Sequence, residues 1–276
     1  MRLFKKVVIV GTGLIGGSMG LAIKKNRLAD TVIGISRRKS TLSLARKIGA
    51  IDIGTRDFNA AAGADLLILA VPVNTLIELS KKLAKIVGLD CIVTDVGSTK
   101  EKIVEKLNKL FPMFVGAHPL AGLEKPGIAN ACPHIFKNTI CIITPVKFSN
   151  KKSLCKITAL WKALGSKVIF MTAAEHDRIA AAVSHLPHAA AFALIGSVPA
   201  KYLKFAASGL KDTTRVAASD PELWSQVFLS NKKNVLRSLG TFEKNIAKIK
   251  SAVRREDCAA LISILNRSQQ IREKIA

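Results

Sequence analysis

Aromatic side chains are scarce in this sequence, and acidic residues are far outnumbered by basic ones. Aromatic residues make up 5% of the chain. Proteins that bind single-stranded nucleic acids need aromatic platforms for the bases, so this scarcity counts against that class. The net charge of +24 would suit a nucleic-acid binder, but equally an enzyme that attracts anionic small molecules. The lysines form no basic run, which disfavours nucleic acid as a partner.

Paired cysteines and long apolar runs are also lacking. The five cysteines show no Cys-x-x-Cys spacing, and their odd number leaves no complete disulfide framework. This usage fits a reducing compartment, so we expect a cytoplasmic protein without a metal site. No uninterrupted apolar run reaches the roughly 18–20 residues of a membrane span. The apolar start from Val7 is broken by glycines, unlike a secretory signal, and the sequence predicts a soluble protein with no membrane partner.

Up to about Met171, short β-branched runs alternate with helical patterns. The run 66–71 has no polar position, as expected of a strand that is covered on both faces. The alternation predicts an α/β fold with an N-terminal, Rossmann-type, doubly wound and mostly parallel sheet. The expected strands are 7–10, 31–35, 64–71, 91–95, 114–117, 139–144 and 167–171.

After Met171 the β-branched runs stop and the pattern becomes helical. Apolar residues three and four positions apart predict long helices at 174–197, 221–239 and 242–275. Pro187 is expected to kink the first of them. We therefore predict two closely coupled domains: residues 1–171 bind a dinucleotide, and residues 172–276 form an all-helical domain that completes the active site.

A glycine-rich motif follows the first predicted strand and opens a helix. It reads Gly11-Thr12-Gly13-Leu14-Ile15-Gly16. In dinucleotide-binding motifs of this kind the first glycine permits a tight turn, the second lets the backbone approach the pyrophosphate, and the third allows close packing of helix on strand. The strand before the motif and the helix after it make it a predicted cofactor site.

The strand expected at 31–35 is followed by Ser36, Arg37 and Arg38, where NAD enzymes usually carry an acid against the ribose hydroxyls. Arginine binds the oxygens of a 2′-phosphate through charge-assisted hydrogen bonds. The missing acid and the two arginines favour NADP, with NAD as the alternative. The arginines could also be no more than solvated surface.

Further residues follow strands at the edge where doubly wound sheets bind their ligands. Val71 and Pro72 follow one strand and Ser98 follows the next, so these residues are expected to border the nicotinamide. Ser98 or Thr99 could instead cap the following helix. His118 follows a later strand in a loop of small residues, and its imidazole is suited to proton transfer near neutral pH.

In the helical part, Ser184 and His188 lie one turn apart on the same helix face. They could line a pocket, or His188 could be a buried histidine satisfied by the backbone. His185 faces elsewhere and is expected to be structural. Arg215 lies in a polar segment between helices, where its guanidinium could hold a substrate carboxylate with two hydrogen bonds.

Over nearly the whole chain, these residues resemble the prephenate and arogenate dehydrogenase family of tyrosine biosynthesis. The likeness rests on five motifs in the family's order. They are Gly11-x-Gly13-x-x-Gly16-Gly17-Ser18, Asp95-Val96-Gly97-Ser98-Thr99-Lys100, Gly116-x-His118-Pro119-x-Ala121-Gly122, Ser184-His185-x-Pro187-His188, and Asp212-x-Thr214-Arg215 followed by Ser219-Asp220-Pro221 and Trp224.

The resemblance implies an oxidative decarboxylation that makes an aromatic ring. Hydride would leave the ring carbon that bears the hydroxyl for NAD(P)+, and the ring carboxylate would depart as carbon dioxide. By the family's pattern, His118 draws off the hydroxyl proton, and Ser98 orients His118 and the hydroxyl. Arg215 would hold a carboxylate, Ser184 and His188 would line the side-chain pocket, and the helical domain would pair two chains into a homodimer.

The sequence leaves the choice between prephenate and arogenate open. Leu123 stands where family members often carry a polar residue, and Glu124 could attract the ammonium group of arogenate. Another open function is that of a dehydrogenase with the same architecture, acting on a β-hydroxy acid or an imine. Such enzymes usually carry a catalytic lysine on the long helix at the domain junction, and this helix has none.

A cofactor-sensing or nucleic-acid-binding protein that keeps the fold without chemistry is the remaining alternative. The joint presence of His118, Ser98 and Arg215 argues against it.

Overall fold

The computed structural model describes residues 2–122, 125 and 127–275. Leu123 and Glu124, which the sequence connects with substrate choice, lie outside the described residues. The chain divides into two compact units, residues 1–231 and 232–276. The boundary that the sequence suggests near residue 171 marks the end of the β/α pattern instead, and as a domain boundary it stays a prediction.

An eight-stranded sheet forms the first part of unit 1, in the order β3-β2-β1-β4-β5-β6-β7-β8. The expected α/β class and all seven expected strands are confirmed, with β3 as an additional edge strand. Every neighbouring pair is parallel except β6 and β7. The strands are β1 (Phe4–Val10), β2 (Ala29–Ile35), β3 (Ile53–Thr55), β4 (Leu66–Leu69), β5 (Ile92–Asp95), β6 (Phe114–Pro119), β7 (Ile140–Thr144) and β8 (Lys167–Phe170).

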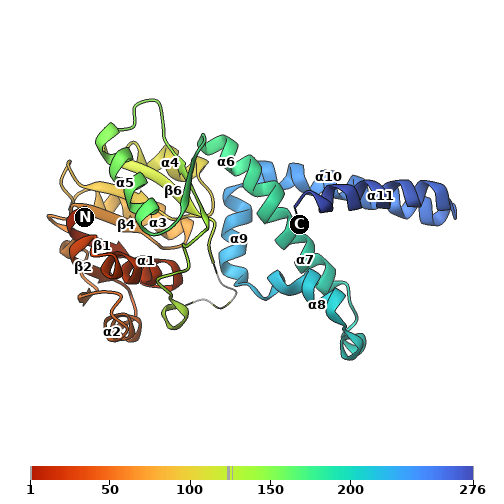
Figure 1. Cartoon of the computed structure of the whole chain (residues 1–276), viewed down its shortest axis with the longest axis horizontal. Helices are drawn as coiled ribbons and strands as arrows, with labels where there is room; N and C mark the ends of the chain where they lie inside the picture. The colour runs from red at the N-terminus through yellow and green to blue at the C-terminus, as the bar shows by residue number, and fades with distance from the viewer. Residues whose placement is uncertain (1, 123–124, 126, 276) are drawn as a thin grey trace. The chain divides into compact units, whose positions relative to one another are not determined.

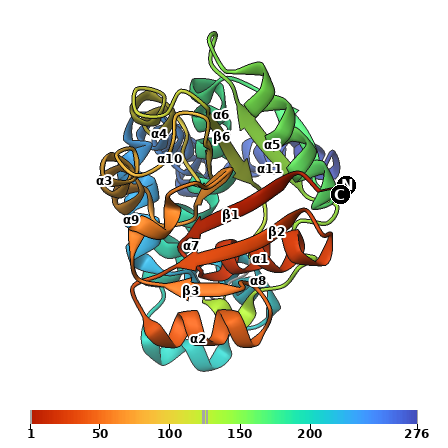
Figure 2. The same cartoon turned by 90° about the vertical axis from the view of Figure 1, so that its left-hand side faces the viewer.

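Helices cover both faces of this sheet (Figure 2). Successive strand residues point to opposite faces, so Val7 and Ile9 enter one core while Val8 and Val10 enter the other. Helices α1 (Leu14–Lys25), α2 (Lys39–Lys47) and α5 (Lys151–Ala163) pack on the first face, and α3 (Val73–Leu83) and α4 (Glu101–Leu107) on the second. Two short 3₁₀ segments lie in the connections between strands: η1 (Phe58–Ala61) between β3 and β4, and η2 (Ile128–Asn130) between β6 and β7.

Two glycines of the motif after β1 stand where a side chain could not fit. Gly11 has a φ of +95°, and a Cβ atom there would lie 2.2 Å from the Ala70 carbonyl oxygen. A Cβ atom on Gly16 would lie 2.0 Å from the Gly11 carbonyl oxygen. The missing side chains therefore let α1 start directly against the ends of β1 and β4, which places its first turn at the carboxyl edge of the sheet.

The first helical stretch after the sheet changes geometry at its centre. It consists of α6 (Ala173–Ala180), a π-helical turn η3 (Ala181–His185) and α7 (Leu186–Gly196). Pro187 has no N–H to donate to the carbonyl of Val183 four residues earlier. The wider turn lies at this point, and π turns of this kind often occur at functional sites.

The later helices differ from the sequence-based expectation at their breaks. The helix predicted at 221–239 is divided in two. Helix α9 (Pro221–Ser230) ends in unit 1, and α10 (Lys232–Arg254) begins with unit 2. The break expected near Gly240 is absent, since an exposed helix tolerates one glycine for about 1 kcal/mol. The chain instead turns at Glu256, whose φ is +52°, before α11 (Cys258–Glu273).

The remaining segments of unit 1 are η4 (Ala200–Phe205), α8 (Ser208–Thr214) and η5 (Arg215–Ala218). Figure 1 shows α6, α7, α8 and α9 following the sheet domain along the chain. In unit 2, α10 and α11 pack against each other as an antiparallel pair.

One stretch, Ala173–Gly196, is long and apolar enough to cross a membrane by length and composition alone. Its mean hydropathy reaches 1.5, and 22% of the window is buried. A single helix of this kind is weak evidence for a membrane span. An apolar helix that its own chain leaves exposed is equally what an interface with another protein chain requires.

Candidate active site

The predicted cofactor residues come together at the carboxyl edge of the sheet. The Gly11 N–H donates to the Ile35 carbonyl oxygen over 2.8 Å, which joins the loop after β1 to the end of β2. The close approach of Gly11 to Ala70 joins the same loop to the end of β4. The glycine motif, Ser36 to Arg38, and Val71 with Pro72 therefore border one region.

The residues in this region fit a dinucleotide. A Cβ atom built on Gly13 would meet nothing within 4 Å, so the backbone there is open to a close ligand. The Thr12 hydroxyl is buried and has no hydrogen-bond partner among the described residues. Arg37 and Arg38 are exposed and Ser36 is half-buried, which leaves both guanidinium groups accessible to an anionic group.

His118 is the last but one residue of β6, and its ring is tied to α6. Its Nδ1 lies 2.8 Å from Nε2 of His176, and the two rings meet edge to face with centroids 5.0 Å apart. Nδ1 of His176 lies 2.8 Å from Oδ1 of the neighbouring Asp177. Both His176 and Asp177 are buried.

Asp177 also fixes the start of α4. Its two carboxylate oxygens accept the backbone N–H groups of Lys100 over 2.6 Å and of Glu101 over 2.9 Å. The sequence left open whether Ser98 or Thr99 caps this helix. Neither hydroxyl does so, because a carboxylate from α6 takes that place. The Ser98 side chain, half-buried at the sheet edge, is therefore not used as a helix cap.

A fully buried ion pair lies beneath the same loop. The Lys100 ammonium contacts Oδ2 of Asp95, and neither side chain is exposed to solvent. Asp95 also accepts the N–H of Gly97 over 2.9 Å and of Ala117 over 3.2 Å. One carboxylate thus holds the loop after β5 against the end of β6, which fixes the distance between Ser98 and His118.

The surroundings of His118 favour its neutral form. The pKa of His118 is held well below its ordinary value, first by burial and then by electrostatic interactions with His176, Lys100 and His185. A neutral imidazole has a lone pair available to accept a proton. At neutral pH, His118 can therefore act as a base.

A second polar cluster connects the sheet edge with α9. Nδ1 of His185 lies 3.2 Å from the Asn231 side-chain amide. The same amide donates to the Asp177 carbonyl oxygen over 2.7 Å. Burial lowers the pKa of His185 to about 4. These contacts agree with the structural role that the sequence suggests for His185.

His188 is the residue that connects Ser184, Arg215 and Trp224. The His188 ring stacks on the Trp224 indole with centroids 3.5 Å apart, and its Nδ1 donates to the Ser184 carbonyl oxygen over 2.9 Å. Burial and the nearby charge of Arg215 lower the pKa of His188, against the hydrogen bond to Ser184. The Ser184 carbonyl thus holds the ring of the half-buried His188, and the pocket-lining role of the two residues stays a prediction.

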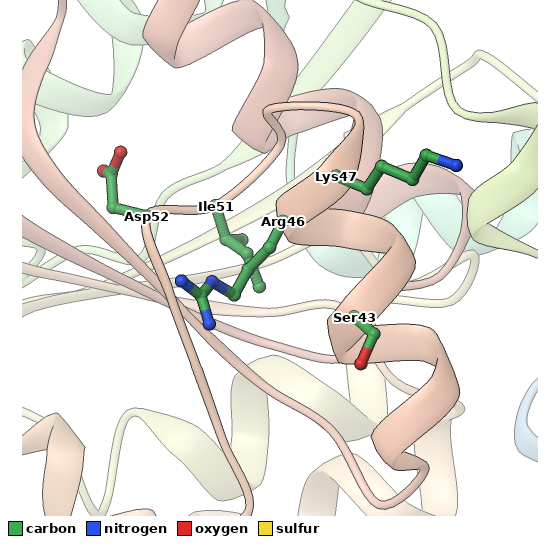
Figure 3. A pocket seen from close by; sticks show the side chains of 5 residues that line it. All are labelled: Ser43, Arg46, Lys47, Ile51 and Asp52. Atoms are coloured by element: carbon green, nitrogen blue, oxygen red, sulfur yellow. The ribbon is translucent and has the colours of Figure 1, made fainter.

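The hollow in Figure 3 is separate from this site. It lies on α2 and the turn after it, with a volume of about 510 Å³, and it is lined by Ser43, Arg46, Lys47, Ile51 and Asp52. None of these residues contacts the cluster around His118. Among the described residues, no group of three or more His, Cys, Asp or Glu side chains is placed to hold a metal ion.

Sequence reasoning did not find His176, Asp177 or Asn231. All three are polar residues in stretches that read as helix, where solvent exposure is the ordinary expectation. The only local signal is the adjacent His176-Asp177 pair, which lies in a charged start, between Glu175 and Arg178, of a long and mostly apolar helical stretch. Lys100 and Asp95 were visible within a motif, but their pairing was not.

Comparison with known proteins identifies relatives along nearly the entire chain. Residues 19–170 match the family model "Prephenate dehydrogenase, nucleotide-binding domain", and residues 172–267 match "Prephenate dehydrogenase, dimerization domain". The chain is 33% identical to the prephenate dehydrogenase of Bacillus subtilis over 278 residues, which covers 97% of this chain and 75% of the relative.

Solved structures show the same likeness. A prephenate dehydrogenase from Aquifex aeolicus, in complex with hydroxyphenyl propionate and NAD+, is 35% identical with a TM-score of 0.92, covering 99% of this chain and 98% of the other. A Synechocystis arogenate dehydrogenase is 29% identical with a TM-score of 0.83, covering 98% of this chain and 100% of the other.

The buried pair under the site generates a stability prediction. Replacing Lys100 by Met leaves the Asp95 carboxylate buried without its counter-ion, and we expect the free energy of unfolding to fall by about 3–5 kcal/mol. The double variant Lys100→Met with Asp95→Asn removes both charges and should regain most of that loss. Urea unfolding of the three proteins measures both differences. A single variant within about 1 kcal/mol of wild type would show that the ion pair is not required.

Proposed function

The chain belongs to the prephenate dehydrogenase family, and we propose that it converts prephenate to 4-hydroxyphenylpyruvate, or arogenate to tyrosine, in tyrosine biosynthesis. The reaction is an oxidative decarboxylation. Hydride leaves the ring carbon that bears the hydroxyl, the ring carboxylate leaves as carbon dioxide, and the electron pair of the broken bond completes the aromatic ring. The observation that carries this proposal is a half-buried histidine at the cofactor edge of a family-matched fold, in surroundings that lower its pKa.

The cofactor is a nicotinamide dinucleotide, whose ring accepts the hydride. The Gly11 turn and the open backbone at Gly13 would hold its pyrophosphate, and Thr12, Leu14 and Ile15 would border it at the start of α1. The backbone N–H groups in this first helical turn attract an anion. Val71 and Pro72, after β4, would line the nicotinamide end of the site.

His118 is the proposed base. Its Nε2 has no hydrogen-bond partner among the described residues, and it would accept the proton of the ring hydroxyl while hydride leaves the same carbon. The proton returns to the phenolic oxygen once the ring is aromatic. Ser98, whose hydroxyl is not used as a helix cap, would hydrogen-bond the substrate hydroxyl and hold it toward His118.

The substrate side chain would lie against Trp224 and the His188 ring that stacks on it. Arg215 supplies a cation beside His188 and would bind a carboxylate through a bidentate hydrogen bond. His188 and Ser184 would form the wall opposite. Prephenate ends in a pyruvyl group and arogenate in an amino acid, and both present a carboxylate to this cation.

A homodimer is the proposed assembly. The second family model describes a dimerization domain, and the matched helices leave large apolar side chains uncovered. In unit 1, Val183, Phe205 and Leu229 are 68%, 74% and 72% exposed. A second copy of the chain would bury this surface, which a soluble monomer rarely leaves open. This proposal also accounts for the apolar helix 173–196 without a membrane, in keeping with the cytoplasmic location that the cysteine usage suggests.

Replacing His118 by Asn should lower kcat by about two to four orders of magnitude, the usual contribution of a positioned base. Cofactor affinity should stay unchanged. Because the pKa of His118 is lowered, the base form persists as pH falls, and the acidic limb of kcat/KM for wild type should lie below pH of about 6.5. Steady-state rates across pH measure both effects. The exposed His134→Asn is the control, and a His118 variant within tenfold of wild type would refute the role.

Replacing Arg215 by Ala should raise the KM for substrate by about ten- to a hundredfold, since a charge-assisted contact is lost. The affinity for the cofactor should barely change. Lys211→Ala, an exposed residue on α8, removes the same charge and serves as the matched control. Equal KM values for the two variants would mean that the carboxylate is bound elsewhere.

We further infer a preference for NADP over NAD. Ser36, Arg37 and Arg38 replace the acid that would repel a 2′-phosphate, and each charge-assisted contact contributes about 1.5–3 kcal/mol. A preference of about tenfold or more in kcat/KM is therefore expected. It should be measured for both cofactors with both prephenate and arogenate, which also settles the substrate.

The double variant Arg37→Ala with Arg38→Ala should lose the preference. Arg46→Ala with Lys47→Ala is the matched control, because it removes two charges from the other end of α2, as Figure 3 shows. Wild type favouring NAD, or a double variant with undiminished NADP preference, would show that the arginines are only solvated surface.

A further inference from the structure

Three side chains form a hydrogen-bonded row that ends at the proposed base. Asp177 lies at the inner end, His176 in the middle, and His118 at the outer end, with both links 2.8 Å long. The inner two residues are buried. Such a row allows only certain placements of hydrogen atoms, because each link needs one donor and one acceptor.

The placement is decided at Asp177. Its carboxylate oxygens face two backbone N–H groups, from Lys100 and Glu101. An N–H can only donate, and several such donors favour the ionised, acceptor-only form of a carboxylate. The third neighbour, Nδ1 of His176, must therefore be a donor and carry a hydrogen atom.

The hydrogen atom on Nδ1 of His176 determines which nitrogen carries a hydrogen atom in both rings. A neutral imidazole with a hydrogen atom on Nδ1 has a bare Nε2, so Nε2 of His176 accepts. Nδ1 of His118 must then donate to it, which leaves Nε2 of His118 bare and able to take a proton.

The geometry points to His176 and Asp177 as positioning residues that set the tautomer of His118, so that the base presents its lone pair to the substrate. This inference rests on the proposed function, because it explains how His118 comes to act as the base. Neither residue touches the substrate in this account. Both affect the proton transfer through His118, and Asp177 in addition holds the start of α4.

A proton on His176 would reverse the row. Nε2 of His176 would then donate to His118, whose Nε2 would carry a hydrogen atom and could not act as a base. Three other groups lie near His118: Lys100 and His185 lower the pKa of His118, and the Asp95 carboxylate is paired with the Lys100 ammonium. The Cys141 thiol of β7, whose pKa burial raises, stays uncharged.

The test compares variants that change the donors and acceptors of the row. In Asp177→Leu, Nδ1 of His176 has no acceptor, so its hydrogen atom can move to Nε2, which reverses the row. In His176→Gln the amide oxygen can still accept from Nδ1 of His118, whereas His176→Leu offers no acceptor. We expect kcat to fall by about 10²- to 10⁴-fold in Asp177→Leu and in His176→Leu, with KM within about threefold in His176→Leu. His176→Gln should retain activity within about tenfold of wild type.

A matched control separates this effect from lost stability. Asn150 caps α5 by accepting two backbone N–H groups, as Asp177 does for α4. Asn150→Ala should therefore lower the melting temperature and leave kcat and its pH profile unchanged. If His176→Gln and His176→Leu lost kcat equally at equal stability, the acceptor at this position would be irrelevant and the inference would be overturned.

Nitrogen-15 NMR of labelled histidine reads the tautomer without substrate. In wild-type protein at pH 8, we expect His118 to carry its hydrogen atom on Nδ1, and Asp177→Leu or His176→Leu to shift it toward Nε2. A hydrogen atom on Nε2 of His118 in wild type would overturn the inference even if the enzyme is active. The expected tautomer in a protein that turns over neither substrate would instead refute the proposed function and leave the inference standing.

Discussion

The Asp177 carboxylate is the contact on which the rest of the site depends. It belongs to the first helix after the sheet, yet its hydrogen bonds go to the start of α4 and to the neighbouring His176. Burying a carboxylate is unfavourable unless its oxygens are matched by donors, and here each oxygen has at least one. The same contact therefore holds α6 on the sheet, terminates the loop that carries Ser98, and orients the ring of His118.

A second buried carboxylate, Asp95, also holds backbone segments of the site in place. It joins the loop after β5 to the end of β6 and is neutralised by Lys100. Parallel strands end at one edge, but they do not by themselves fix the loops beyond them. Side chains that accept backbone N–H groups supply the missing constraint, and the positive charge of Lys100 also disfavours a proton on His118. Structural and chemical functions thus share the same few buried charges.

The surface of the helical part follows a different principle. Large apolar side chains there remain open in the isolated chain, so the energy of burying them is available only to an assembly. The +24 net charge acts at longer range, since it raises the local concentration of anionic ligands and is screened by salt. Such a field attracts both a dicarboxylate substrate and a dinucleotide. Contacts with Arg215 and Arg37 would then orient these ligands.

The sequence by itself determined the α/β class, the seven strands and the glycine turn, because strand burial and the fit of Gly11 and Gly16 depend on local pattern and on sterics. It also placed His118 and Ser98 at the ligand edge, since parallel strands must end there. It did not predict the break after α9 or the continuation of α10 through Gly240, because packing overrides local propensity. Only the tertiary structure brought Asp177 to α4 and Asn231 to His185, since contacts between residues far apart in sequence leave no periodic signal.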